Sequence, residues 1–160
     1  MNNIEYLALE HMEPNKLMTI VNEDSVRTHL VHHPYFDANS IQTWLNDKMR
    51  IDALPGCKVR GVAINGDLAG WCGIQPDDNG VEIAIVISKK FWGSGIAIFK
   101  TLMHWAQELN HNEVLFHLLD SRREYKALAK IATKVHHTEL LGRRFTTYCF
   151  PVEPKENNDV

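Results

Sequence analysis

The spacing of apolar residues divides the chain into a helical N-terminal third and a strand-rich remainder. Alternation over Ile4 to Leu9 predicts a short first strand. Apolar residues three and four apart from Glu13 to about Val31 predict helix, with a break into two helices at residues 22–25. A further helix begins after a cap at Asn39 or Ser40 and presents one apolar stripe: Ile41, Leu45, Met49 and Ile51.

From residue 59 onward the pattern is that of strands joined by tight turns. Two apolar runs, Val59 to Ile64 and Leu68 to Ile74, flank Asn65-Gly66-Asp67. Asn-Gly between such runs is a strong hairpin signal, because both turn residues need positive φ. After a polar loop from Pro76 to Gly80, the β-branched run from Val81 to Ser88 predicts a third strand that is buried on both faces.

The second half of the chain alternates helix and strand before it closes with a hairpin. Residues 96–110 have helical spacing and residues 114–119 have strand composition. Residues 122–131 predict another helix, and residues 135–150 predict a hairpin around Gly142. The apolar stripe of the helix over 96–110 comprises Ile96, Phe99, Leu102, Met103, Ala106 and Leu109.

This order of elements predicts an α/β (α+β) fold with a mixed central sheet. The sheet begins as an antiparallel meander, continues through a right-handed parallel crossover and carries helices on both faces. Residues 1–150 are expected to form a single domain, and residues 151–160 a polar C-terminal tail.

Composition narrows the class of protein further. The chain has 160 residues, of which 44% are hydrophobic and 23% charged, and its formal net charge is -3. Such a chain lacks the basic footprint of a nucleic-acid binder, and it contains no apolar run long enough to cross a membrane. Its three cysteines are far apart and odd in number, which favours reduced core thiols in a cytoplasmic protein.

The segment that carries the clearest chemistry joins the strand over 81–88 to the following helix. It reads Trp92-Gly93-Ser94-Gly95-Ile96-Ala97. Glycines let the backbone turn tightly and approach a ligand, and a helix start offers free N–H groups and a positive dipole end. The segment therefore predicts a pyrophosphate site with amide donors from Gly93, Gly95, Ile96 and Ala97. It lacks the Gly-Lys-Ser/Thr of a Walker loop and the third glycine of a Rossmann fingerprint.

In its context, this segment resembles the pyrophosphate turn of the GNAT acetyltransferases. Their signature is Gln or Arg, two residues, Gly, one residue, then Gly or Ala, and Gly95 and Ala97 match its last two positions. Trp92 stands where Gln or Arg is usual. The run from Phe91 to Ala97 is similar to the form "YWGKGIA" of the RimJ/RimL-like branch, and the resemblance extends from about Ile4 to Phe150.

The resemblance implies acetyl-CoA as co-substrate and a GNAT-like sheet whose fourth strand diverges from its neighbour. The backbone of Ile85, Val86 and Ile87 is then expected to pair with the pantetheine arm, with an amide near Ile87 facing the thioester oxygen. The residues from Trp92 to Ala97 would hold the pyrophosphate. Ser121 stands where the family often has an Asn that binds the pantetheine, although helix capping is an alternative role for Ser121.

Two residues are candidates for proton transfer. Glu82 is the one charged residue within Val81 to Ser88 and occupies the place of the Glu in the branch's "AEIGY" pattern. A carboxylate on a buried strand has a raised pKa, which suits a general base, although an exposed Glu at the strand start is the alternative. The family's usual acid, a Tyr, is replaced by Leu128, and Tyr125 lies one helical turn away as a substitute.

The acceptor pocket in GNAT folds is walled by the early helical region. Tyr35 and Trp44 lie there, and Trp71 lies on the hairpin, so these three are candidate substrate contacts. No metal site is expected, because the paired histidines His32-His33 and His136-His137 would point to opposite faces of a strand.

The residues and the resemblance together favour an N-acetyltransferase that moves an acetyl group from acetyl-CoA to a primary amine. The acceptor is a small-molecule amine or a protein amino group. A non-catalytic acyl-CoA-binding regulatory or sensor module is the main alternative, and an α/β protein without any CoA site is another. A homodimer through the C-terminal strands stays open, and neither a nucleic-acid nor a membrane partner is expected.

Overall fold

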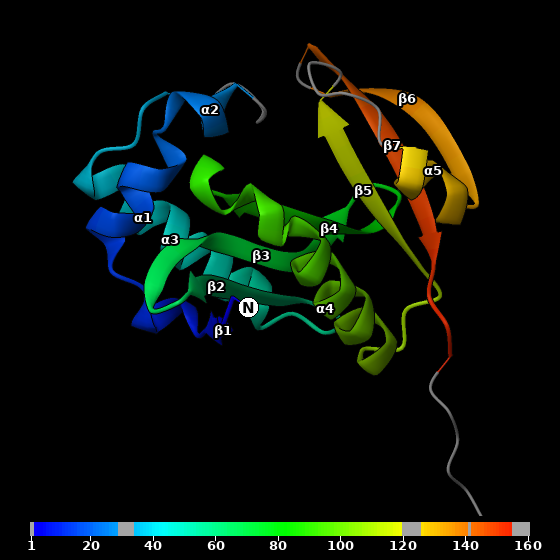
Figure 1. Cartoon of the computed structure of the whole chain (residues 1–160), viewed down its shortest axis with the longest axis horizontal. Helices are drawn as coiled ribbons and strands as arrows, with labels where there is room; N and C mark the ends of the chain where they lie inside the picture. The colour runs from blue at the N-terminus through cyan, green and yellow to red at the C-terminus, as the bar shows by residue number, and fades with distance from the viewer. Residues whose placement is uncertain (1, 29–33, 120–125, 141, 155–160) are drawn as a thin grey trace, which may run out of the picture.

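The computed structural model describes residues 2–28, 34–119, 126–140 and 142–154. Within these residues the strands form one seven-stranded sheet, in the order β1-β2-β3-β4-β5-β7-β6 (Figure 1). The strands are β1 Ile4–Leu7, β2 Lys58–Ile64, β3 Asp67–Asp77, β4 Gly80–Ile87, β5 Glu113–Leu119, β6 Lys134–Leu140 and β7 Arg143–Pro151. The helical segments are η1 Leu9–His11, α1 Pro14–Val21, α2 Asp24–Arg27, α3 Ala38–Asp52, η2 Lys89–Ser94, α4 Gly95–Glu108 and α5 Lys126–Ile131.

The antiparallel meander at the start of the sheet is confirmed. Asn65 and Gly66 have φ of 54° and 87°, as the Asn-Gly turn between β2 and β3 requires. β3 continues to Asp77 and pairs with the first residues of β4, so the loop predicted over 76–80 is wrong at its start. The register of β2 against β3 shifts between Val62 and Ala63, which marks a β-bulge.

Helices cover both faces of the sheet, as predicted. On one face, α1 and α3 pack over a core that includes Leu17, Leu45 and Val59. On the other face, α4 packs through Ile98 and Leu102 over the larger core. The aromatic ring of Phe99 on α4 contacts rings of β5 and β7, so α4 bridges the two halves of the sheet.

Three local predictions are corrected by the packing. The buried stripe of α4 comprises Ile98, Leu102, Trp105 and Ala106. Ile96 is 72% exposed, because the helix is rotated about its own axis relative to the orientation that the apolar spacing predicts. The cap of α3 is Asp37, whose carboxylate accepts from the backbone N–H of Ser40 in a capping box. β4 is only partly buried on both faces, since Ala84 and Ile85 keep some exposure.

At its centre the sheet is joined by one pair of residues on parallel strands. Glu82 of β4 pairs with Leu115 of β5, and these two fully described strands share no other backbone pair. β4 continues to Ile87 and β5 to Leu119, and the two strands separate in that direction (Figure 1). The separation that the family resemblance implied is therefore present.

The closing hairpin is also present. All of β6 pairs with Arg143 to Cys149 of β7, and Gly142 between the two strands has φ of 75°. β7 ends at Pro151 and Val152 is buried, so ordered structure runs past residue 150, where the sequence analysis places the end of the domain. None of the helices in the described part of the chain has the length and apolar character needed to span a bilayer.

The end of β4 is held in place by a close approach of Gly70 on β3. Gly70 has φ of 156°, and a Cβ there would collide with the carbonyl oxygen of Val86. We expect Gly70→Ala to lower the free energy of unfolding by more than about 3 kcal/mol, because β4 must shift as well as accept the strain at this φ. Urea denaturation followed by circular dichroism measures the change.

Gly80→Ala is the matched control for this substitution. Gly80 also has a positive φ, 141°, but a Cβ there would meet nothing within 4 Å. Its loss should stay near 1 kcal/mol, which is roughly the cost of backbone strain alone. Equal losses in the two variants would show that the contact with β4 contributes nothing.

Candidate active site

Glu82 lies at the point where β4 and β5 separate. It pairs with Gln75 on β3 and with Leu115 on β5, and its side chain is 23% exposed. The amide Nε2 of Gln75 donates to Oε1 of Glu82 over 2.7 Å. The alternative of a fully solvated Glu at the strand start is therefore wrong: the carboxylate is largely enclosed, and one of its oxygens has a fixed partner.

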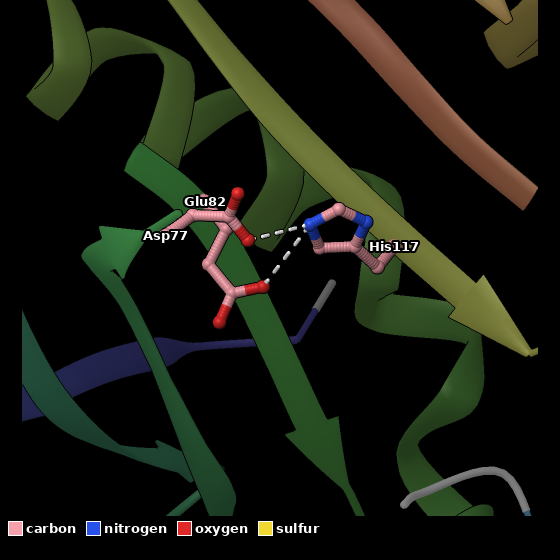
Figure 2. Close-up of side chains that lie close together, drawn as sticks. All are labelled: Asp77, Glu82 and His117. Carbon is pink, nitrogen blue, oxygen red and sulfur yellow. Dashed lines mark hydrogen bonds and ion pairs between the residues drawn. The ribbon is translucent and has the colours of Figure 1, made fainter. Parts of the chain in front are cut away.

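The second oxygen of Glu82 faces His117, as Figure 2 shows. Nε2 of His117 lies 3.7 Å from Oε2 of Glu82 and 2.8 Å from Oδ2 of Asp77. Nδ1 of His117 lies 2.8 Å from the hydroxyl of Thr147, which is in turn 2.8 Å from the hydroxyl of Thr138. The imidazole, 8% exposed, is thus held on both sides and points one nitrogen at two carboxylates.

Burial raises the pKa of Glu82, because desolvation penalises the charged carboxylate. The nearby Asp77 acts in the same direction. The Gln75 amide, the His117 imidazole and the Lys48 ammonium act against it, and the net shift is upward. A carboxylate with a raised pKa is better suited to accept a proton near neutral pH than an ordinary surface Glu.

Two of the predicted substrate contacts meet each other and are linked to this carboxylate through Lys48 and Gln75. Trp44 on α3 and Trp71 on β3 are in edge-to-face contact, with ring centroids 5.1 Å apart. Nζ of Lys48 lies 4.6 Å from the Trp71 ring and donates to Oε1 of Gln75 over 2.6 Å. Burial lowers the pKa of Lys48, although Glu82 and Asp47 oppose that shift. Gln75 therefore joins an enclosed ammonium to an enclosed carboxylate.

The third predicted contact, Tyr35, lies beside α2. It is 61% exposed, its hydroxyl donates to Asp24 over 3.3 Å, and the Arg27 guanidinium lies 3.7 Å from its ring centroid. The structure gives Tyr35 no contact with Glu82. Two further predicted residues, Ser121 and Tyr125, lie outside the described residues.

The glycine segment is more regular than a tight turn. Lys89 to Ser94 form a short 3-10 helix, and Gly95 starts α4 with helical φ and ψ of -58° and -38°. Neither Gly93 nor Gly95 has a positive φ, and a Cβ on either residue would meet nothing within 4 Å. The chain's own packing and backbone angles therefore do not require glycine at these two positions.

Several groups around the segment already have partners. The N–H of Gly95 donates to the carbonyl of Trp92, and the indole Nε1 of Trp92 donates to the carbonyl of Ile87 over 3.1 Å. Ser94 is buried and its hydroxyl accepts from Asn2. Ile96 and Ala97 are exposed at the start of the 14-residue helix α4. The indole bond places the glycine segment directly beside the end of β4.

The predicted backbone platform is arranged along one side of β4. Ile85, Val86 and Ile87 pair with Cys72, Trp71 and Gly70 of β3. Their opposite side is the one from which β5 has separated, and no β5 residue pairs with them. The predicted platform and Glu82 thus lie on the same strand, β4, and the glycine segment follows that strand in η2 and at the start of α4.

A shallow hollow lies beside His117, on the face of β5, β6 and β7 that carries this side chain. Its volume is about 180 Å³. It is lined by Asn79, Glu113, Leu115, His117, Lys134, His136, Thr138, Thr147 and Cys149. His136 lines the hollow and His137 does not, as expected of neighbours on a strand.

Sequence reasoning missed Asp77, His117 and the Lys48–Gln75 link. Asp77 was assigned to a loop, and the site role of His117 depends on the register of three strands that are not adjacent in sequence. The one local signal was alternation: Glu113, Leu115 and His117 share a face of β5, and Leu115 is the residue paired with Glu82.

The structure is thus a mixed α/β sheet whose central strands diverge, with a helix start beside the divergence and an enclosed carboxylate where it begins. The model of the Acetyltransferase (GNAT) family matches residues 17–129. The chain therefore belongs to the GNAT acetyltransferase family.

Solved structures show the same fold. A probable acetyltransferase of the GNAT family from Chromobacterium violaceum is 16% identical, with a TM-score of 0.69 over 94% of this chain and 87% of that one. An N-acetyltransferase from Staphylococcus aureus is 14% identical, with a TM-score of 0.68 over 96% and 99%. The structure of yncA from Salmonella typhimurium, which contains its cofactor acetyl-CoA, is 13% identical, with a TM-score of 0.65 over 100% and 99%. No curated protein matches the chain.

The enclosure of Glu82 can be tested by titration. We expect Gln75→Leu to raise the pKa of Glu82 further, because the amide that stabilises its charged form is removed. The carbon-13 shift of the Glu82 carboxyl, assigned by its loss in Glu82→Gln, reports the titration. Gln42→Leu, which removes an exposed amide on α3 that bonds Asn46, should leave it unchanged. A Glu82 carboxyl that titrates like an exposed Glu would contradict the enclosed site.

Proposed function

We propose that the chain transfers an acetyl group from acetyl-CoA to a primary amine by direct attack, with Glu82 as general base. The observation that carries this proposal is an enclosed carboxylate with a raised pKa at the point where β4 and β5 separate. Membership of the GNAT family supports the acetyl donor, and the local geometry supports the role of each residue.

The donor side of the proposed site is the edge of β4 with the start of α4. On the free side of β4, the backbone of Ile85 and the N–H of Ile87 would pair with an extended pantetheine arm, in the manner of an added strand, while the Ile87 carbonyl holds the Trp92 indole. Beyond them, the open space in front of Gly93 and Gly95 would let a pyrophosphate approach the start of α4, where Ile96 and Ala97 are exposed. The residues present therefore fit acetyl-CoA, which would supply the thioester carbonyl.

The acceptor side of the proposed site must remove a proton. A lysine-type amine, with a pKa of about 10.4, is almost fully protonated at neutral pH and cannot attack until it loses a proton. The Gln75 amide holds Oε1 of Glu82 in place by a hydrogen bond. The His117 imidazole and the Asp77 carboxylate determine the electrostatic environment of Oε2. Glu82 would accept the proton directly or through water as the amine attacks.

The leaving thiolate needs little assistance. Leu128 stands where the family usually has a Tyr, and Tyr125 is the substitute proposed from the sequence. A thiol has a pKa of about 8.5, so its thiolate is a stable leaving group near neutral pH. We propose that turnover continues without a strong acid at this position.

The acceptor would enter between Trp44, Trp71 and the hollow beside His117. This region offers aromatic walls and hydroxyl groups, which suit a small amine or a protein amino group. Membership of the RimJ/RimL-like branch is part of the proposal, supported by the segment from Trp92 to Ala97.

The donor site is tested by substitution at Gly95. We expect Gly95→Trp to abolish acetyl-CoA binding in calorimetry, because the indole fills the space in front of α4. Gly95→Ala is the folding control and should unfold at a slightly higher temperature, since Ala is favoured over Gly in a helix by about 0.5–1 kcal/mol. Unchanged binding in Gly95→Trp would place acetyl-CoA elsewhere, and no binding by the wild type would end the proposal.

The base is tested by Glu82→Gln. With a panel of amines and a thiol-release assay, we expect kcat to fall by about 10²–10⁴-fold, while acetyl-CoA affinity stays within about twofold. Glu108→Gln is the matched control, because Glu108 pairs with His104 on the exposed side of α4. Wild-type binding of acetyl-CoA without release of thiol on any amine would instead support a non-catalytic acyl-CoA-binding module.

A further inference from the structure

We propose that Asp77, Glu82 and His117 form a binding site for a divalent transition-metal ion of the zinc type. The three side chains come from β3, β4 and β5 and converge on one point, as Figure 2 shows. Binding by these residues needs no acetyl-CoA, so the proposal stands apart from the acetyl-transfer activity.

The spacing of the donor atoms suits a small ion. One nitrogen and two carboxylate oxygens all lie within 4.8 Å of one another. Tetrahedral zinc with bonds of about 2.0–2.2 Å places its ligand atoms roughly 3.3–3.6 Å apart. The distances from Nε2 of His117 to Asp77 and Glu82, 2.8 Å and 3.7 Å, lie on either side of that value. Small side-chain rotations would therefore admit an ion in place of a proton between Nε2 of His117 and Oδ2 of Asp77.

The surrounding hydrogen bonds orient the ligands as they do in metal sites. When an ion displaces the proton between Nε2 of His117 and Asp77, Nδ1–H can donate to the Thr147 hydroxyl and Nε2 becomes a metal ligand. The Thr147 hydroxyl can then donate to Thr138. On the other ligand, Gln75 occupies Oε1 of Glu82 and leaves Oε2 for the ion. Each of these two ligands thus has a second contact that fixes its direction.

The donor set selects the class of ion. An imidazole with two carboxylates favours zinc, cobalt or nickel over magnesium and calcium, which prefer all-oxygen sites. The two carboxylate charges balance a divalent ion. The ammonium of Lys48 donates to Oε1 of Gln75, whose amide donates to Oε1 of Glu82, the oxygen that the ion would not use. Three protein ligands leave one position for water, so the site would be an open one.

A bound ion would occupy the same oxygen of Glu82 that faces His117. If Glu82 is the base, as the proposed function holds, the ion and proton transfer compete for that oxygen. Zinc would then inhibit acetyl transfer, and this one consequence rests on the proposed function. Binding itself is measured without substrate, so the two proposals can fail separately.

The test is calorimetric titration of the untagged full chain with zinc chloride, with cobalt(II) absorption as a second readout. We expect one ion per chain, and an affinity at least about tenfold lower in both His117→Gln and Asp77→Asn. Circular dichroism verifies that each variant is folded. If His117→Gln does not fold, the zinc affinity of Asp77→Asn, which lies at the end of β3, tests the site alone. Magnesium chloride should give no comparable heat.

Two control variants separate this site from other metal-binding groups. His104→Gln removes the exposed His104–Glu108 pair on α4, and Cys149→Ser removes the thiol that lines the neighbouring hollow. Both should bind zinc as the wild type does. The proposal is overturned by absence of binding at about 100 μM zinc, by full binding in Asp77→Asn, or by loss of binding in either control variant.

Discussion

The arrangement of the site depends on a single parallel pair in the middle of the sheet, between Glu82 of β4 and Leu115 of β5. Every other neighbouring pair of strands in the described structure is antiparallel and pairs over several residues. Because the two halves meet at one position and then diverge, β4 keeps an unpaired side from Ile83 onward. A backbone that lacks its partner strand is available to an extended ligand. Here that side leads to the start of α4.

The same divergence separates the two chemical tasks. On the proposed assignment, the donor side would use backbone groups and the open space in front of two glycines that the fold itself does not require. The acceptor side uses side chains that are enclosed and held in place, from Lys48 through Gln75 to Glu82 and from Thr147 through His117 to Asp77. Glu82 stands between these two chains of contacts. Its raised pKa follows from enclosure, and its orientation follows from the partners on either side.

The parts of the structure that local chemistry determines were predictable. The Asn65-Gly66 turn needs two positive φ values. The break between α1 and α2 coincides with the polar residues 22–25. Glu82 was identifiable because a single charge interrupts an apolar strand. The rotation of α4 was not predictable, since the exposed Ile96 and buried Ile98 reflect contacts with the sheet. His117 and Asp77 were missed for the same reason: their meeting depends on the register of three strands, which no local pattern specifies.

Amide hydrogen exchange with and without acetyl-CoA tests whether the divergent edge of β4 and the start of α4 hold the acetyl donor, because it reports on the backbone of both segments at once. We predict slower exchange at Ile85 to Ile87 and at Ile96 and Ala97 when acetyl-CoA is present, with the edge strands β1 and β6 unchanged. Protection confined to other parts of the chain, or no protection at saturating acetyl-CoA, would contradict the assignment of the divergent edge of β4 and the start of α4 as the donor site.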